Sequence, residues 1–231
     1  MASPIITIDG PSGSGKGTIS RLVADRLGWR LLDSGALYRL VAYAGQERGL
    51  SPYDEPGHAD IAQMLDVQFG LGPHGGEQIW LSGDEVSQRI RTEQAGEGAS
   101  RVAAMPAVRS ALLDRQRAFA GPPGLVADGR DMGTVIFPGA PLKIFLTANA
   151  EERARRRYNQ LKDKGLGANL AALSLEIAER DRRDAHRAVA PLRPADDAVI
   201  VDSTAMTIDA VVARVLELAA ARLPPGAVSK V

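Results

Sequence analysis

The sequence predicts an α/β protein with a central, parallel, five-stranded sheet and helices on both faces. Five short apolar runs rich in β-branched residues recur along the chain, and each precedes a segment that can be helical. Alternation of strand and helix is typical of a parallel sheet, because each crossover between parallel strands needs room for a helix. The five predicted strands are residues 4–9, 30–33, 125–128, 142–147 and 198–202.

The composition is typical of a single globular protein and excludes sites that depend on cysteine. With 231 residues and 45% apolar content, the chain can bury one sizeable core together with an inserted subdomain. Lys and Arg equal Asp and Glu at 28 each, so nothing favours a general polyanion binder. The absence of cysteine excludes disulfides, thiolate metal sites and cysteine nucleophiles, and is typical of a reducing compartment.

Targeting signals are not evident in the sequence. The amino terminus has neither a basic leader nor a long apolar run, and no later stretch approaches the roughly 18 apolar residues of a membrane span. We therefore expect a cytoplasmic protein with no membrane association. No surplus apolar helix face is apparent, which favours a monomer.

Two regions interrupt the strand–helix alternation. Residues 67–71 and 78–81 alternate apolar and polar side chains around 73–76, which predicts an antiparallel hairpin within an insertion at about 60–100. Residues 151–188 are rich in charge and helix formers and are interrupted at 164–167, so we expect two helices flanking a mobile turn. We expect the tail from residue 224 to be frayed.

The first predicted strand leads into a phosphate-binding motif. The segment fits G-x-x-x-x-G-K between a strand and a helix, where backbone N–H groups and the helix N-terminus bind phosphate and the lysine reaches its outer oxygens. The magnesium-binding hydroxyl, which usually follows the lysine, comes one position later, at Thr18. A flexible Gly/Ser turn is the alternative, which the flanking strand and helix disfavour. The predicted ATP-binding residues are Gly10, Pro11, Ser12, Gly13, Ser14, Gly15, Lys16, Gly17 and Thr18.

Polar residues follow two further predicted strands, at the sheet edge where α/β proteins bind ligands. Ser34 and Arg39 follow the second strand, although Ser34 could simply cap a helix and Arg39 could be solvated. Asp128, Arg130 and Asp131 follow the third strand through glycines, which favours a polar ligand there. A structural ion pair between Arg130 and Asp131 is the alternative.

Arginines recur on the two predicted helices after the fourth strand. Arg180, Asp184 and Arg187 stand at i, i+4 and i+7 and so share one helix face, which is either a ligand surface or an exposed set of salt bridges. Three arginines precede the predicted mobile turn, as a lid over transferring phosphates requires, because closure must exclude water and neutralise charge. They are Arg153, Arg156 and Arg157.

Together these motifs resemble the bacterial cytidylate kinases over about residues 6–212. The most specific pieces are IDGPSGSGKGT, LDSGALYR, ADGRDMGTVIFP and ERDRRDAHRAVAPL. The resemblance implies a P-loop NTPase core at about 1–59, 101–150 and 168–223, a CMP-binding insert at about 60–100 and a lid at about 151–167. It also implies transfer of the γ-phosphoryl group of ATP to CMP or dCMP with Mg²⁺.

The family pattern, carried over position by position, implies an acceptor site. It assigns Ser34, Arg109, Asp131 and Arg187 to the pyrimidine; Ser100, Arg180 and Asp184 to the pentose; and Arg39 and Arg130 to the acceptor phosphate. An ionised Asp131 would accept from the N4 amino group of cytosine and repel O4 of uracil, so UMP should be a poor substrate.

The implied chemistry assigns positioning and charge neutralisation to Lys16, Arg130, Asp128 and Arg157. No catalytic base is required, because the attacking phosphate oxygen is already ionised, and His58, His74 and His186 are read as non-catalytic. Thr18 and Asp128 are the candidate magnesium ligands.

Two other readings stay open from the residues alone. One is a P-loop kinase for another small metabolite, such as a different nucleotide, a sugar acid or shikimate, with no requirement for Asp131. The other is a nucleotide-binding regulatory switch, which would need no second anion site. Neutral charge, few aromatic residues and no basic stripe disfavour a nucleic-acid enzyme.

Overall fold

A computed structural model describes residues 3–71, 77–163, 167, 169–224 and 226–227. The chain forms two compact units. The first unit combines Met1–Asp33 with Gln116–Val231, and the second is the continuous segment Ser34–Arg115. Each unit has its own sheet.

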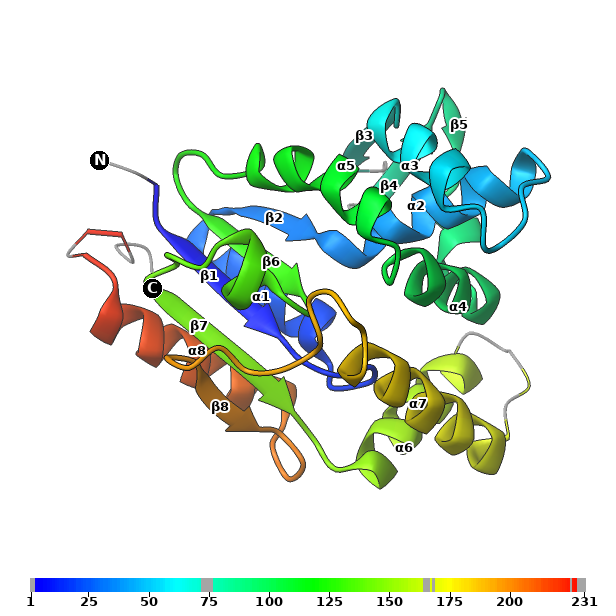
Figure 1. The fold of residues 1–231 in the computed structure, drawn as a ribbon. Coiled ribbons are helices and arrows are strands. Elements are labelled where there is room, and N and C mark those ends of the chain that lie inside the picture. Colours follow the sequence, from blue (N-terminus) through cyan, green and yellow to red (C-terminus); the bar gives the residue numbers. More distant parts are fainter. Residues whose placement is uncertain (1–2, 72–76, 164–166, 168, 225, 228–231) are drawn as a thin grey trace. The chain divides into compact units, whose positions relative to one another are not determined.

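The first unit is built on a five-stranded parallel sheet in the order β2-β6-β1-β7-β8 (Figure 1). The prediction of a central parallel sheet with flanking helices is therefore confirmed. The strands are β1 (Ile5–Asp9), β2 (Arg30–Asp33), β6 (Leu125–Gly129), β7 (Leu142–Thr147) and β8 (Val199–Asp202).

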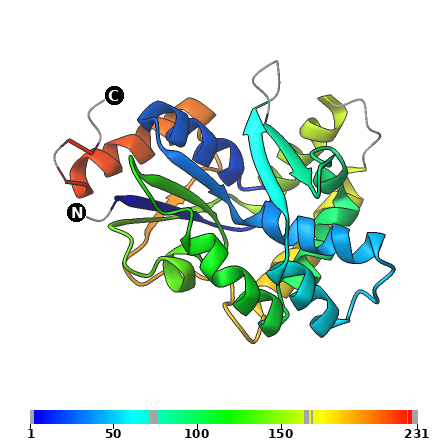
Figure 2. The same cartoon turned by 90° about the horizontal axis from the view of Figure 1, so that it is seen from above.

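Apolar residues on both faces of the sheet explain the layered arrangement. Leu125, Val126 and Ala127 are consecutive in β6, so their side chains alternate between the two faces of the sheet, and all three are fully buried. Helices α1 (Lys16–Leu27) and α8 (Ile208–Arg222) pack on each other and on the sheet, and their apolar residues share one core with the central strands. Figure 2 shows these two helices, in blue and red, on the same face of the sheet.

A helix pair follows β7 and completes the first unit. Helices α6 (Ala150–Asp163) and α7 (Leu170–Ala185) pack against each other, which agrees with the two helices expected in this region. The side chain of Asn149 accepts from the Glu152 N–H and that of Asn169 from the Ala172 N–H, so each helix begins at a capping asparagine. A five-residue π-helical turn, η2 (Met132–Ile136), follows β6 and was not foreseen.

The second unit contains helices and a small antiparallel sheet. The sheet order is β3-β4-β5, and the pairing of β3 with β4 confirms the two strands of the predicted hairpin. The turn expected at 73–76 lies outside the described residues. Strand β5 pairs with β4 and was not predicted. The elements are α2 (Ser34–Glu47), α3 (Glu55–Gln63), β3 (Val67–Leu71), β4 (Glu77–Leu81), β5 (Asp84–Glu85), η1 (Arg89–Arg91), α4 (Glu93–Val102) and most of α5 (Pro106–Arg117).

The predicted insert and lid can be placed on these units. The insert at about 60–100 falls inside the second unit, which is longer, and the lid at about 151–167 begins with α6. Of the turn expected at 164–167, only Gly167 is described. In the expected frayed tail, residues 225 and 228–231 lie outside the description. Among the described residues, no helix is both long and apolar enough to span a membrane.

Candidate functional site

The loop between β1 and α1 presents an open helix N-terminus. Gly13 and Gly15 have φ values of 76° and 86°, a region that glycine enters without steric cost. Gly15 is also the N-cap residue of α1, and no side chain caps this helix end. The N–H groups of the first helical turn and the positive end of the helix dipole therefore remain available to an anion, as the phosphate-loop motif predicts.

Lys16 and Asp128 are two charged groups with opposite pKa shifts beside this loop. Burial and the charge of Arg130 lower the pKa of Lys16 to about 7, against the opposing effect of Asp128. Burial raises the pKa of Asp128 to about 7, against the opposing effect of Lys16. The Lys16 ammonium group donates to the Pro11 carbonyl at 3.2 Å. Each group is therefore poised to change protonation when a highly charged ligand arrives.

The Asp128 carboxylate lies beside Gly17 of the phosphate loop. A methyl group placed on Gly17 would lie 3.3 Å from Oδ2 of Asp128, and the other oxygen, Oδ1, is buried without a hydrogen-bond partner among the described residues. Thr18, the other predicted magnesium ligand, follows Gly17 and is exposed. The described residues contain no cluster of three or more His, Cys, Asp or Glu that could hold a metal alone.

Asp9 fixes the segment that carries Arg130 and Asp131. Its two carboxylate oxygens accept from the backbone N–H groups of Met132 and Gly133, both at 2.8 Å, and so cap the first turn of η2. Burial raises the pKa of Asp9 to about 7, against the lowering effect of these two bonds. Sequence reasoning missed this residue, because its partners lie more than 120 positions away.

Arg130 forms an ion pair with Asp184 of α7. Its Nε lies 2.9 Å from Oδ2 of Asp184, and the two side chains are only 16% and 4% exposed. Burial acts to lower the pKa of Arg130, but Asp184, Asp128 and Asp181 outweigh it and hold the pKa above its usual value. The alternatives drawn from sequence did not include this long-range pair.

Asp184 interacts with the other charged residues of the predicted ligand face near the end of α7. Burial acts to raise the pKa of Asp184, but the charges of Arg130, Arg180 and Arg187 outweigh it and hold the pKa below its usual value. Arg180 and Asp184 lie on α7, while Arg187 lies two residues beyond its end and is 9% exposed. Asp131, which precedes η2, is 3% exposed.

The three arginines of the predicted lid differ in their contacts. Arg153 and Arg156 donate to backbone carbonyls of the phosphate loop, at Ser12 and Ser14 respectively. Arg157 is half-buried and donates to the side chain of Gln160 on its own helix. The sequence grouped all three arginines together, and the structure shows that two of them, Arg153 and Arg156, contact the loop backbone.

The remaining predicted acceptor residues belong to the second unit. Ser34 opens α2, and Ser100 lies in α4; both are buried. Arg39 donates to the carbonyls of Ile90 and Thr92, at 2.8 and 3.1 Å. Arg109 is 6% exposed, and its guanidinium carbon lies 5.8 Å from the centre of the Tyr38 ring. Within this unit, each of the four side chains is therefore either buried or hydrogen-bonded.

Comparison with known proteins gives consistent matches. The sequence matches the family model for cytidylate kinase over residues 6–221. Cytidylate kinase from Pseudomonas aeruginosa (strain PAO1) is 63% identical over 217 residues, which cover 93% of this chain and 94% of that protein. Cytidylate kinase from Stutzerimonas stutzeri (strain A1501) is 60% identical over 220 residues, covering 95% and 96%. Among solved structures, TT1252 from Thermus thermophilus aligns with 97% of this chain and 100% of that chain, at a TM-score of 0.46 and 19% identity.

Proposed function

Because the chain belongs to the cytidylate kinase family, we propose that it transfers the γ-phosphoryl group of ATP to CMP or dCMP, giving ADP and CDP or dCDP. We propose further that it does so in the cytoplasm as a monomer, with only small-molecule substrates.

One observation in the first unit carries the proposal. The charges of Arg130 and Arg180 reach Lys16 strongly enough to contribute to the fall of its pKa to about 7. The lysine of the phosphate loop and two arginines far from it in the sequence are therefore close enough to interact electrostatically. Asp128 and Asp184 offset part of this positive charge, and bound anions would offset more of it. A nucleoside triphosphate and a second phosphate group would supply them.

On the donor side, the loop positions the triphosphate of ATP. The open N–H groups at the start of α1 would hold the phosphate oxygens, and Lys16 would neutralise charge on the oxygens of the transferred group. Arg157 is a half-buried arginine of α6, and burial lowers the pKa of its guanidinium, so an anion beside it would favour its charged form. We assign it the remaining positive charge beside the transferred group.

On the acceptor side, an ionised phosphate oxygen of CMP would attack the γ-phosphorus. The bond from phosphorus to the bridging oxygen of ADP breaks as the new bond forms, and no base is needed. We propose that Arg130 holds the acceptor phosphate, that Arg180 and Asp184 hold the pentose, and that Asp131 and Arg187 read the base. In the second unit, Arg39 is proposed to hold the phosphate, and Ser34, Ser100 and Arg109 are proposed to contact the nucleoside.

Magnesium fits the residues beside the loop. The buried Oδ1 of Asp128 and the exposed hydroxyl of Thr18 are oxygen donors of the kind Mg²⁺ binds, and Mg²⁺ takes most other ligands from water and phosphate. When bound, Mg²⁺ would offset the negative charge of the β- and γ-phosphates. Asp128 would orient it, directly or through a water molecule.

Replacing Asp128 with asparagine is expected to lower kcat about 100-fold while the Kd for ATP changes little. The amide keeps the shape of the side chain but loses the negative charge that would face Mg²⁺. Steady-state kinetics and calorimetric ATP binding, each over a range of Mg²⁺ concentrations, check this. Unchanged turnover at saturating Mg²⁺ would remove Asp128 from the metal site.

The proposed function is tested by following ADP release with CMP, dCMP, UMP and AMP side by side. We expect fast turnover of CMP and dCMP and weak turnover of UMP. In Asp131→Ala the preference for CMP over UMP should fall by about 10- to 100-fold, because the carboxylate that accepts from N4 is gone. No turnover with any of the four nucleotides would discard the proposed function. If Asp131→Ala kept the wild-type preference for CMP over UMP, only the base-reading role of Asp131 would be discarded.

A further inference from the structure

Two arginines of α6 bind the back of the phosphate loop. Nη1 of Arg153 donates to the Ser12 carbonyl at 2.9 Å, and its Nε donates to the Ala148 carbonyl at 3.0 Å. Nη1 of Arg156 donates to the Ser14 carbonyl at 3.2 Å. Both arginines come from one helix and bind alternate carbonyls of the same loop.

These contacts determine where two N–H groups of the loop point. A peptide unit is planar and trans, so the carbonyl of one residue and the N–H of the next point in opposite directions. With the Ser12 and Ser14 carbonyls directed at α6, the N–H groups of Gly13 and Gly15 are directed away from it. N–H groups directed in this way can donate to phosphate oxygens on the side of the loop opposite α6.

Arg153 also fills the space behind the loop. A methyl group on Gly13 would lie 3.0 Å from Cβ of Arg153, so the arginine packs directly on this glycine. Its side chain is 8% exposed and forms an ion pair of 2.6 Å with Asp181 of α7. Arg153 is thus held by both helices of the pair while it contacts the loop.

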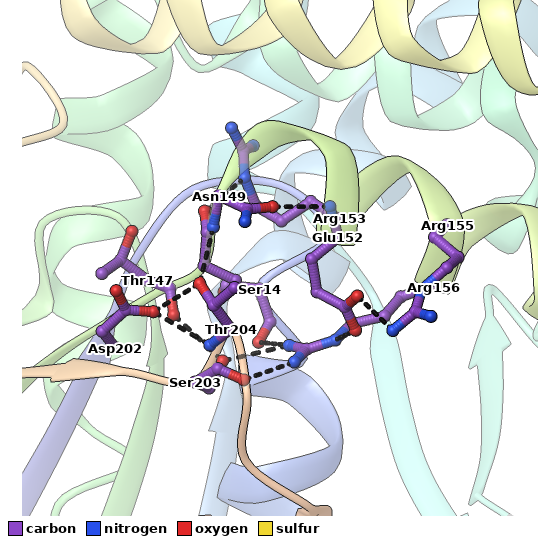
Figure 3. A network of polar contacts seen from close by, with 11 residues as sticks. Ser14, Thr147, Asn149, Glu152, Arg153, Arg155, Arg156, Asp202, Ser203 and Thr204 are labelled. Carbon is purple, nitrogen blue, oxygen red and sulfur yellow. Dashed lines mark hydrogen bonds and ion pairs between the residues drawn. The ribbon is translucent and has the colours of Figure 1, made fainter.

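Arg156 is braced by the loop that follows β8 (Figure 3). Its Nη1 and Nη2 donate to the hydroxyl and carbonyl of Ser203, at 3.0 and 2.6 Å, and its Nε bonds to Glu152 at 2.9 Å. The Ser203 hydroxyl in turn donates to the Thr147 carbonyl at 2.9 Å.

The start of α6 is fixed in the same network. The Asn149 N–H donates to the Thr204 hydroxyl at 3.0 Å, and that hydroxyl bonds to Asp202 at 2.6 Å. The first turn of α6, the end of β7 and the loop after β8 therefore form one bonded frame (Figure 3). The two arginines project from this frame.

We propose that Arg153 and Arg156 are positioning residues that hold the phosphate loop in its anion-binding shape before the nucleotide arrives. This inference rests on the proposed function and assigns these arginines a role apart from that of Arg157. They act through the loop backbone rather than by touching the phosphate, so the first turns of α6 serve as part of the loop's support.

The test measures anion binding apart from catalysis. Arg153→Lys and Arg156→Lys keep the positive charge. A lysine has one ammonium group, however, and cannot donate to two separated carbonyls as each guanidinium does. We expect each variant to bind inorganic tripolyphosphate and a non-hydrolysable ATP analogue about tenfold more weakly, by the same factor for both ligands, as judged by calorimetry. CMP binding should be unchanged.

Two matched variants separate this effect from loss of stability. Asp181→Asn removes the ion pair of Arg153 but leaves its carbonyl contacts, and Arg214→Lys alters an exposed ion pair with Glu217 on α8. Arg214→Lys should bind tripolyphosphate as the wild type does, and Asp181→Asn should lose less affinity than Arg153→Lys. Unchanged tripolyphosphate affinity in Arg153→Lys and Arg156→Lys, or a loss confined to the ATP analogue, would overturn the inference. Failure of the proposed function would show separately, as wild-type protein that binds tripolyphosphate without phosphorylating CMP.

Discussion

Replacing Lys16 with methionine is expected to lower kcat for CMP phosphorylation about 1,000-fold. Methionine keeps most of the apolar stem but removes the charge that would neutralise the oxygens of the transferred phosphoryl group. Burial already disfavours the charged form of Lys16, so the variant should be no less stable than the wild type in thermal unfolding. A loss of less than about tenfold would show that Lys16 is not part of the charge-neutralising set.

The same lysine should make ATP binding depend on pH. In the free protein Lys16 is largely neutral above its pKa of about 7, whereas bound phosphate favours the charged form. Binding near pH 8 should therefore take up a proton, and ATP affinity should fall as pH rises above 7. Calorimetry in buffers of different ionisation enthalpy measures this uptake. Lys16→Met should take up correspondingly less, and equal uptake in both proteins would assign the proton elsewhere.

Replacing Arg130 with methionine is expected to reduce both activity and stability. Turnover should fall by about 100- to 1,000-fold, because the acceptor phosphate loses its cation. The free energy of unfolding should fall by about 3 kcal/mol, since Asp184 is almost fully buried and loses the partner at 2.9 Å. Arg180 and Arg187 still act favourably on Asp184, which places this loss at the low end for a broken buried ion pair. Steady-state kinetics and urea unfolding at neutral pH check the two effects.

A double variant distinguishes the two roles of Arg130. In Arg130→Met/Asp184→Asn the charges of both partners are gone, but Arg180 and Arg187 also lose their favourable interaction with Asp184. The double variant should therefore be no more stable than Arg130→Met, and its activity should stay low. The pair itself stabilises the protein only while Asp184 is ionised, and its pKa lies below the usual value. The stability gap between wild type and Arg130→Met should therefore narrow as the pH falls below about 4. Recovery of activity in the double variant would contradict acceptor binding by Arg130.

The strands and the phosphate loop could be predicted because their signals are local. The bounds of β2 and β7 agree with the predicted runs at 30–33 and 142–147, since each is a short run with apolar residues that is bounded by turn residues and precedes a helical pattern. The glycine pattern of the loop is equally local. Strand β5 has only two residues and depends on pairing with β4, so no periodicity was available to reveal it.

The contacts that shape the candidate site could not be predicted, because each joins residues far apart in the chain. Asp9 caps a turn that begins at Met132, and Arg156 reaches both Ser14 and Ser203. Burial and charge at such positions depend on the finished fold. For the same reason the sequence could place Arg153, Arg156 and Arg157 on one helix but could not say which of them face the loop backbone.

The order in which the ribosome delivers these segments has a consequence for folding. Strand β1 is in the middle of its sheet, yet the residue that pairs with Ile5 is Leu125, and the hydroxyl that braces Arg156 belongs to Ser203. At about 5–20 residues per second, roughly ten seconds or more of translation separate the phosphate loop from Ser203. The second unit is continuous in sequence and can begin to fold during that interval. The loop, although it occupies the start of the chain, is therefore among the last parts of the protein to acquire its final shape.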